Sequence, residues 1–591
     1  LAQLFQSNQG FMFNLAPLQQ QLVSNVRLAA LVLMAAVGFV LLIACGNLAS
    51  LLIARAVVRE RETSIRTALG ATRVRLLRQF LAESLLLSVL GGVCGVLLAN
   101  IAVRSMRLIS PAALPRAGQI EIDSRVLFFA LGISLLTGIV FGLIPVLHAF
   151  HSNVSESLKE AGRGSGEGVG RYRVRATLVV GEVALALVLL VGAGLMVRSL
   201  NLLTRVDAGF DPANVLTFSI NLPQGKYLDD KIADFLPHST DKANIFLRQA
   251  VEGIKQVPGV VAVGAVPLLP ISGNSWGKVV TFYDRPLPAT VDKLPPIEYR
   301  PVVGDYFKAM GIRLVQGRVL DDHDTLQSPM VAVVNQEFVR RYVSGQNPIG
   351  KIISVNPPSS VLPPHLVPKN VPPDYPFKAT IVGVVGNARN TSLNEAADPM
   401  VYCPYAQEAE GTLNMFFTVR TDRDPYSVMS AVRREIYQLD KDLPVANISS
   451  MDDIVSFSVG QARLEMLVLE AFGALALLLS GVGIYGLMSY SVTQRTREIG
   501  IRMALGARWS DVMRGVMKQG LLLTAFGLAI GTTGAVSLTR TMKSMIFGIS
   551  AADPMVLAGV CGLLALTALV AIYFPARRAA KIDPQIALRS E

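Results

Sequence analysis

The amino-acid sequence predicts an α-helical integral membrane protein with one large α+β domain outside the membrane. Three observations support this fold class. Of the 591 residues, 51% are hydrophobic and only 17% are charged, and the mean hydropathy is +0.45, values typical of membrane proteins rather than soluble enzymes. The apolar residues gather in long runs with few or no charges. One short basic segment occurs twice, each time between two such runs.

Seven apolar runs are long enough to cross a bilayer, so we expect seven spanning helices. They are Leu28–Ala54, Ser84–Val103, Val126–Leu147, Ala176–Val197 (interrupted only by Glu182), Ala471–Gln494, Gln519–Thr539 and Pro554–Ala576. Lys and Arg are frequent in residues 55–80, 149–175 and 495–518 and in the C-terminal tail, and less frequent in 104–125 and 540–553. The positive-inside rule therefore places the first group in the cytoplasm and the long polar region outside.

The repeat indicates two copies of one membrane unit. Residues 61–71 and 497–507 are identical at eight of eleven positions, at an offset of 436, and the same offset pairs Gly91 with Gly527 and Gly95 with Gly531. The first unit should then once have had its own leading helix and outside domain, so the chain is expected to be an N-terminally truncated piece. The expected parts are a remnant of that domain (1–26), a first membrane unit (27–150), a Gly-rich cytoplasmic linker (151–175), the leading helix of the second unit (176–197), an outside domain (198–462) and a second membrane unit with a cytoplasmic tail (463–591).

The outside domain alternates strand and helix patterns. Strands are predicted at Val215–Leu222, Val260–Val266, Met415–Arg420 and Val445–Ile448, and amphipathic helices at Asp241–Lys255 and Asp424–Leu439. Between these two groups, Met330–Val334 and Thr380–Val385 also have strand character. We therefore expect two split βαβ units that bracket an inserted subdomain.

Several motifs together resemble one known family. They are the repeated Arg-Glu-x-x-Ile-Arg-x-Ala-Leu-Gly-Ala segments and, in the outside domain, Asp305–Ile312, Gln316–Arg318, Val333–Gln336, Asn347–Lys351, Ile381–Val385 and Tyr402–Tyr405. This pattern resembles the FtsX-like permeases of the MacB type of ABC transporter, and it is closest to the duplicated orphan permeases described from Acidobacteria. The resemblance covers nearly the whole chain. Glu182 departs from it, because a neutral polar residue is expected there.

The resemblance implies a multi-pass protein of the bacterial inner membrane with a large periplasmic domain. It implies that a separate cytoplasmic ABC ATPase, in two copies, binds ATP and Mg²⁺, and that this chain has no nucleotide-binding domain of its own. The helices would pass motion to the periplasmic domain instead of forming a through-pore. The lipid bilayer is an implied partner, and a periplasmic adaptor or envelope protein a further one.

The repeated basic segments are the candidate functional site. Ile65, Leu69 and Leu76, like Ile499, Met503 and Val512, recur at helical spacing. Each segment therefore predicts a short amphipathic helix on the cytoplasmic membrane surface, ended by the following Gly-Ala pair. A loop whose Arg residues only bind lipid headgroups would explain the charges, but not the repeated sequence. The resemblance implies that these segments dock the ATPase, through Arg61, Glu62, Ile65, Arg66, Ala68, Leu69 and Gly70 and through Arg497, Glu498, Ile501, Arg502, Ala504, Leu505 and Gly506.

Other motifs support no catalytic, cofactor or metal site. Gly345–Ile352 fits most of a phosphate-binding loop, but Ile352 stands where Ser or Thr would bind Mg²⁺, so we expect a turn. Asp321–Asp324 has no accompanying His or Cys cluster and is expected to be solvated. Glu182 and Glu470 are expected to reach the membrane interface rather than to relay protons. The net charge of +12 is explained by topology, so nucleic acid is not an expected partner.

The predicted function is that of a permease that couples ATP hydrolysis by a partner to movement of a periplasmic domain, for export or extrusion. The alternative is a non-transporting signalling or scaffold protein that regulates an envelope enzyme. A proton-driven transporter would need acids or broken helices near the midplane, and the sequence offers little of either. No motif identifies the substrate.

Overall fold

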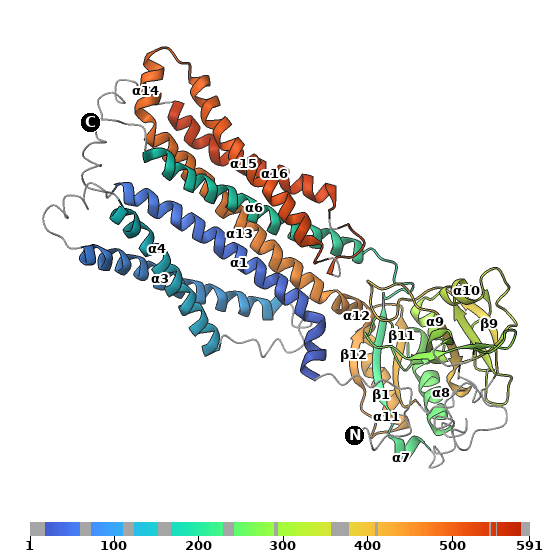
Figure 1. Cartoon of the computed structure of the whole chain (residues 1–591). Coiled ribbons are helices and arrows are strands. Elements are labelled where there is room, and N and C mark those ends of the chain that lie inside the picture. Colours follow the sequence, from blue (N-terminus) through green and yellow to red (C-terminus); the bar gives the residue numbers. More distant parts are fainter. Residues whose placement is uncertain are drawn as a thin grey trace, which may run out of the picture. The chain divides into compact units, whose positions relative to one another are not determined.

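The computed structural model describes residues 18–58, 73–109, 123–151, 167–228, 241–288, 293–355, 378–407, 412–542, 545–550 and 552–580. The described chain forms two compact units (Figure 1). Residues 203–460 make an α/β unit, and the remaining described residues make a helical unit. Each unit has its own hydrophobic core.

Seven long helices and one short helix form the helical unit within the described residues. They are α1 (Leu18–Val58), α3 (Arg73–Ile109), α4 (Ser124–His151), α6 (Glu167–Leu203), α13 (Gly460–Gln494), α14 (Thr496–Ala504), α15 (Trp509–Thr539) and α16 (Pro554–Ala580). Six of the long helices contain a described segment long and apolar enough to span a membrane. In α4 the described apolar stretch, Ser124–Val140, is shorter than a candidate membrane span. The prediction of seven spans is therefore wrong by one for the described chain.

The helices extend beyond the apolar runs that predicted them. The clearest case is α6, which begins at Glu167 inside the stretch predicted as a flexible linker. Two side chains near its start have partners on other helices. Tyr172 accepts a hydrogen bond from Gln519 on α15, and Arg175 donates to the backbone carbonyl of Ser50 on α1. These contacts hold in helical form a segment whose glycines suggested flexibility.

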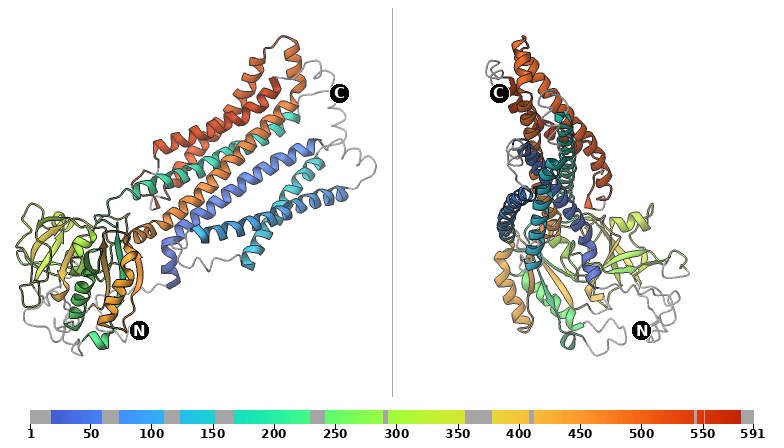
Figure 2. Two further views of the ribbon diagram at one scale, coloured as in Figure 1. Left: turned by 180° about the vertical axis from the view of Figure 1, so that it is seen from behind. Right: turned by 60° about the vertical axis from the view of Figure 1, so that its left-hand side comes forward.

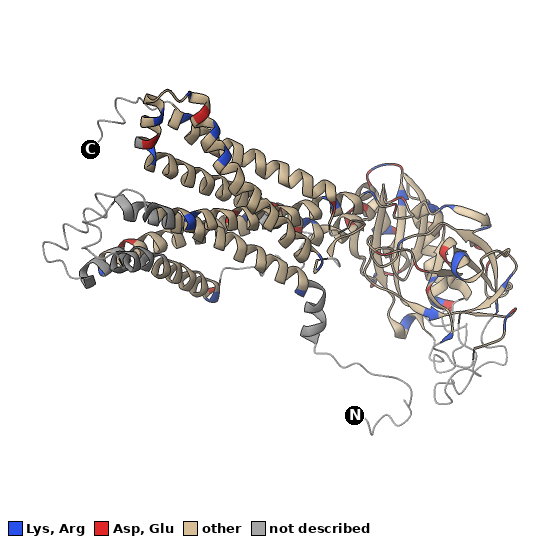
Figure 3. Cartoon of the chain, turned by 45° about the horizontal axis from the view of Figure 1, so that its top comes forward, with Lys and Arg blue, Asp and Glu red and all other residues tan. Residues whose placement is uncertain are grey.

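Helix α6 lies at the centre of the unit. Its buried share is larger than that of any other span, and its residues Ala186, Leu187 and Leu195 join a core with side chains from α1, α13, α15 and α16. α15 packs on α16, α3 packs on α4, and α1 contacts α4; Figure 2 shows α3 and α4 on the far side of α1 from α6. Charged residues are sparse along these helices and gather near their ends (Figure 3), as expected for membrane-spanning segments.

One twelve-stranded sheet organises the α/β unit. The order along its main path is β12-β1-β11-β2-β5-β10-β7-β9-β8-β4, with β3 beside β5 and β6 beside β9. The strands are β1 (Val215–Asn221), β2 (Val260–Val266), β3 (Gly277–Val279), β4 (Thr281–Phe282), β5 (Pro296–Gly304), β6 (Leu314–Gly317), β7 (Val331–Asn335), β8 (Ile352–Ser354), β9 (Ala379–Val385), β10 (Met400–Pro404), β11 (Asn414–Thr421) and β12 (Ala446–Ser450). The helices are α7 (Gln224–Tyr227), α8 (Asp241–Lys255), α9 (Tyr306–Met310), α10 (Gln336–Tyr342), α11 (Met429–Leu439) and α12 (Met451–Ser458).

Two hydrophobic cores divide this unit as the sequence predicts. In the first, α8 and α11 cover β1, β2 and β11, and the rings of Phe218 and Phe417 stack with centroids 4.9 Å apart. In the second, α10 packs on β7, β9 and β10 through the fully buried Phe338. The eight predicted strands and helices are present. One is broken, because Asp424 accepts a hydrogen bond from the Tyr426 N–H and a 3-10 turn (Pro425–Val428) precedes α11.

Candidate functional site

The second basic segment forms the short helix α14 and the turn that joins it to α15. Gly506 has φ +99°, a conformation that favours glycine. Its N–H donates to the Met503 carbonyl, and the Ala507 N–H donates to the Arg502 carbonyl. These two bonds are the Schellman pattern of a helix C-terminus. The predicted end of the helix at Gly506-Ala507 is therefore confirmed.

The inner face of α14 packs on the ends of three longer helices. Ile499, only 9% exposed, forms a small core with Val492 of α13 and Ala579 of α16, and Met503 packs against this core together with Val512 of α15. The expected amphipathic pattern is present, but helix ends, rather than lipid, cover this apolar face. Because the contacts are close and apolar, they fix α14 to α13, α15 and α16.

The outer face of α14 combines apolar side chains with charge. Leu505 is 83% exposed, Ile501 is 43% exposed and Trp509, at the start of α15, is 49% exposed. Glu498 and Arg502 are also exposed and form an i,i+4 ion pair at 2.5 Å, in the favourable order on a helix. This apolar and charged surface is typical of a protein-binding face. Trp509 belongs to it but was not predicted, because it follows the Gly506-Ala507 pair that ends the repeated segment.

The structure places the other predicted coupling residues as follows. Ala504 and Gly506 are exposed beside Leu505, and Arg497 lies in the first turn of α14. The first copy of the segment, with Arg61, Glu62, Ile65, Arg66, Ala68, Leu69 and Gly70, lies outside the described residues. By the repeat, Ile65 and Leu69 correspond to Ile501 and Leu505, which are exposed on α14; which way the first copy faces stays a prediction.

Two buried charged residues of α6, Arg175 and Glu182, lie in the helical unit where α1, α6 and α13 meet. Arg175 on α6 is only 2% exposed. Its guanidinium lies 3.9 Å from the centre of the Tyr490 ring on α13 and donates to Ser50 on α1. Such a cation above an aromatic face is stabilised most where water is excluded. Arg175 therefore ties together three helices that are distant in sequence.

Glu182 lies two turns further along α6 and is buried, which corrects the expectation that it reaches the interface. It is 3% exposed, and neither carboxyl oxygen has a hydrogen-bond partner among the described residues. Glycines make room for it on both neighbouring helices. A Cβ at Gly46 of α1 would lie 2.6 Å from Oε1, and one at Gly483 of α13 would lie 2.1 Å from Oε2. Glu470, by contrast, is exposed on α13.

In the α/β unit the acidic loop is organised by hydrogen bonds. Arg318 donates to both oxygens of Asp324, at 2.8 and 2.6 Å, and the Asp321 N–H donates to the same carboxylate. Burial alone would raise the pKa of Asp324, but these bonds outweigh it and the pKa lies below its ordinary value. Asp324 therefore serves to hold this loop, and the expectation that all these acids are solvated is wrong for it.

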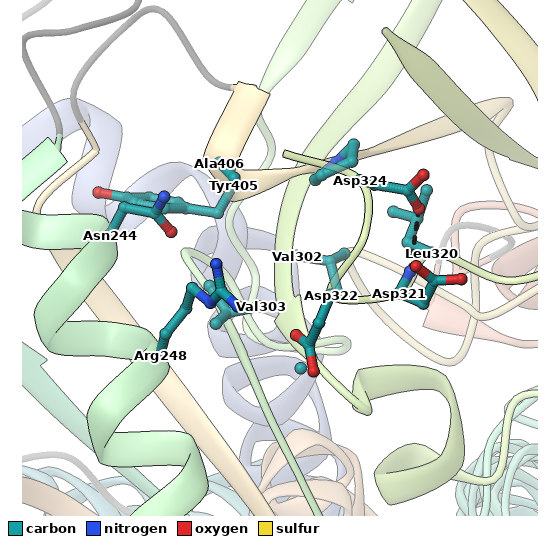
Figure 4. A pocket seen from close by; sticks show the side chains of 12 residues that line it. Asn244, Arg248, Val302, Val303, Leu320, Asp321, Asp322, Asp324, Tyr405 and Ala406 are labelled. Carbon is teal, nitrogen blue, oxygen red and sulfur yellow. Dashed lines mark hydrogen bonds between the residues drawn. The ribbon is translucent and has the colours of Figure 1, made fainter. Parts of the chain in front are cut away.

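The same loop borders a small cleft in the α/β unit. Figure 4 shows Asn244 and Arg248 of α8 on one side of the cleft and Asp321 and Asp322 on the other. Arg248 and Asp322 are both exposed. Within the described residues, no three His, Cys, Asp or Glu side chains are placed to hold a metal ion together.

Family models match most of the chain. The model of the FtsX-like permease C-terminal domain matches residues 34–154 and again residues 470–584. The model of the MacB-like periplasmic core domain matches residues 127–435. The double match of the first model coincides with the two membrane units that the repeat predicts.

Curated relatives are similar in sequence at a moderate level. The macrolide export ATP-binding/permease protein MacB of Azoarcus sp. (strain BH72) is 29% identical over 302 residues, covering 49% of this chain and 42% of that protein. The pyoverdine export ATP-binding/permease protein PvdT of Pseudomonas aeruginosa is 26% identical over 364 residues, covering 58% and 49%. The chain thus spans less than half the length of these relatives. The periplasmic region of MacB from Actinobacillus actinomycetemcomitans is a structural neighbour with 16% identity and a TM-score of 0.25, covering 42% of this chain and 92% of that one.

Proposed function

The chain belongs to the family of FtsX-like permeases with a MacB-like periplasmic core domain, and from this premise we propose that it couples a partner's ATP hydrolysis to movement of its periplasmic domain. The protein is a multi-pass membrane protein of the ABC exporter permease type with a periplasmic domain. In the proposal it lies in the bacterial inner membrane and exports or extrudes a substrate. A separate ABC ATPase binds ATP and Mg²⁺, and two copies of it dock on the two basic segments.

The outward face of α14 is the observation that carries this proposal. An exposed leucine, isoleucine and tryptophan beside an ion pair expose apolar area that a soluble partner would cover. A helix that only anchored the chain to headgroups would turn its apolar residues toward the bilayer. In α14 the residues that pack inward are already covered by other helices, so Leu505 and its neighbours are left for another partner.

The connections of α14 explain how a push on it would travel. Its inner face is fixed to α13, α15 and α16, so movement of α14 moves the ends of all three. α13 begins at Gly460, directly after α12 of the α/β unit, and α6, which ends at Leu203, is followed along the chain by β1, which begins at Val215. Motion along either helix therefore reaches the periplasmic domain through the chain itself. The buried Arg175 would make α1, α6 and α13 move together.

Charge reversal at both basic segments tests the proposal. Arg66→Glu together with Arg502→Glu should abolish co-purification of the ATPase while membrane insertion is unchanged, because Arg502 is exposed and its loss leaves the α14 core intact. Lys518→Glu is a matched control, since it reverses an exposed charge of α15 near the same membrane face. Unchanged ATPase recovery with the double variant would refute the assignment of the coupling segments.

A signalling or scaffold role is the second candidate function. It would use the same membrane units and periplasmic domain, so the distinction must come from a phenotype. Export that depends on the partner's catalytic ATPase residues supports the transporter. Regulation of an envelope enzyme that persists when those residues are inactivated supports the scaffold.

A further inference from the structure

The buried carboxyl group of Glu182 has no role in the function proposed above. It lies on α6, is 3% exposed, and receives no hydrogen bond from any described residue. An ionised carboxylate without a partner is very costly in an apolar interior, and an acid within a membrane span is a candidate functional group for that reason. Some cation must therefore compensate the charge of Glu182 in this packing.

The neighbouring side chains of α1 and α13 bring a further acceptor close to this carboxyl group. Asn47 of α1 donates through Nδ2 to the Leu479 carbonyl of α13, at 2.9 Å, which leaves its Oδ1 as a free acceptor. A Cβ at Gly483 would lie 2.8 Å from this Oδ1 and 2.1 Å from Glu182 Oε2. Both acceptors thus border one small space beside Gly483. Two acceptor oxygens in such a space repel each other unless a proton or a metal ion lies between them.

The charged groups of the surrounding helices do not compensate Glu182. No Lys, Arg, His, Asp or Glu occurs within seven residues of Gly46 on α1 or of Gly483 on α13, or in residues 519–539 of α15. The titratable side chains in these stretches are Cys45, Tyr485 and Tyr490, which carry no positive charge. On α6 itself, Arg175 lies seven residues earlier, about 10 Å along the helix, and is bonded instead to its partners on α1 and α13.

The space beside the carboxyl group favours a proton over a metal ion. A Cβ at Gly46 would lie 2.6 Å from Oε1 and one at Gly483 would lie 2.1 Å from Oε2, so helix backbones border both oxygens. Metal ions that prefer oxygen take about six ligands or more. Glu182, Asn47 and the buried Ser480, whose hydroxyl has no partner in the described chain, offer fewer side-chain oxygens than that. A proton needs one acceptor and no additional room.

We propose that Glu182 is a proton-binding site of the helical unit. In the described packing the carboxyl group is protonated, and its O–H is directed toward Asn47 Oδ1. A motion that admits water beside Glu182 lets the carboxylic acid give its proton to that water and leaves a hydrated carboxylate. Close packing of α1, α6 and α13 around this residue therefore takes up a proton, and loosening it releases the proton. The proposal rests on these helix contacts and does not depend on the ATPase.

Infrared spectroscopy of the full chain in lipid vesicles tests the proposal. The spectrum of Glu182→Gln, which keeps the size and neutrality of a protonated carboxyl group, is subtracted at pH 7 from that of the unaltered chain. We expect the difference to contain the C=O stretch of a carboxylic acid and no carboxylate bands. Glu470→Gln is the matched control, because Glu470 is exposed on α13 and its difference spectrum should contain carboxylate bands. Carboxylate bands from Glu182 at pH 7 would overturn the proposal.

Thermal unfolding at several pH values provides a second, independent readout. The packed chain keeps a proton that the unfolded chain loses, so its stability should fall as the pH rises. The melting temperature of the unaltered chain should therefore fall relative to that of Glu182→Gln from about pH 5 up to the pH at which the carboxylic acid band disappears. Glu182→Leu replaces Glu182→Gln in both experiments if the latter does not accumulate. A difference in melting temperature that does not change with pH would overturn the proposal, as would stabilisation by added Na⁺ together with carboxylate bands, which would identify a metal-ion site.

Discussion

The substitution Gly483→Ala, which adds one methyl group, is the most direct test of how α1, α6 and α13 pack around Glu182. In Gly483→Ala the new Cβ would lie 2.1 Å from Glu182 Oε2 and 2.8 Å from Asn47 Oδ1, far inside van der Waals contact. On its other side the carboxyl group lies close to Gly46 of α1, where an added Cβ would be 2.6 Å from Oε1, so movement away from α13 brings it toward the α1 backbone. Helix α13 must therefore shift or the Glu182 side chain must leave its rotamer. Overpacking of this kind costs about 1–3 kcal/mol.

The second substitution in the cycle is Glu182→Ala, which removes the obstructing carboxyl group. The two changes should be non-additive, with a coupling energy of about 1–3 kcal/mol, as found for residues in contact. Gly486→Ala is the matched control on the same helix, because a Cβ there meets no atom of the described chain within 4 Å. It should be neutral or stabilise α13 by up to about 1 kcal/mol, since alanine is the better helix former.

Thermal unfolding of the full chain in mild detergent provides the assay. The structure predicts the order of stability Gly486→Ala above Gly483→Ala, with the Gly483→Ala, Glu182→Ala double variant above Gly483→Ala. If Gly483→Ala were as stable as Gly486→Ala, the Glu182 carboxyl would not lie between these glycines. Additive effects in the double variant would lead to the same conclusion.

Three further predictions concern α14 and the α/β unit. Leu505→Asp should reduce ATPase recovery at least tenfold with unchanged thermal stability, because this side chain is 83% exposed; a loss of stability instead would show that it is packed. Gly506→Val should destabilise the C-terminal end of α14 by about 1–3 kcal/mol, because φ at this position is +99°. Hydrogen exchange of the α14 amides should therefore become faster. Asp440→Asn should destabilise the α/β unit by roughly 2 kcal/mol at pH 7, because Asp440 accepts hydrogen bonds from Lys226 and Tyr227. The hydrogen bond from Lys226, and after it the one from Tyr227, hold the pKa of Asp440 below its ordinary value. The loss of unfolding free energy caused by Asp440→Asn should therefore be complete above about pH 4 and become smaller as the pH falls toward the folded-state pKa. A loss that does not change with pH would contradict this.

Strong local patterns made the main elements of the α/β unit predictable. Helix α8 and strand β2 have the predicted bounds, because an amphipathic helix is followed by Pro258-Gly259 and then by a β-branched run. Six strands were not predicted. β10 has five residues and β5 has nine, but the apolar run of β5 is interrupted by Glu298, Arg300 and Pro301. The other four, β3, β4, β6 and β8, have only two to four residues each. Such short strands carry too little pattern to recognise, and their pairing partners are set by the tertiary fold.

Contacts between distant helices limited the prediction of the membrane unit. The long apolar runs located the helices, because hydrophobic length is a local property. Burial of Glu182 depends on Gly46 and Gly483, which lie on two other helices, so its own sequence neighbourhood suggested only a position near a helix end. The outward face of α14 is a similar case. Periodicity alone did not show which of its two apolar stripes, that of Ile499 or that of Ile501, packs inward.

We propose above all that this permease works with an ABC ATPase, and the decisive measurement is recovery of that partner from native membranes. The full-length protein is extracted in mild detergent with ATP present, isolated, and scored for a co-purifying ATPase. We expect a partner with a phosphate-binding loop, recovered with the unaltered chain and lost from the Arg66→Glu, Arg502→Glu variant. Recovery of the permease without any such ATPase would refute coupling to an ABC ATPase and favour the signalling or scaffold role.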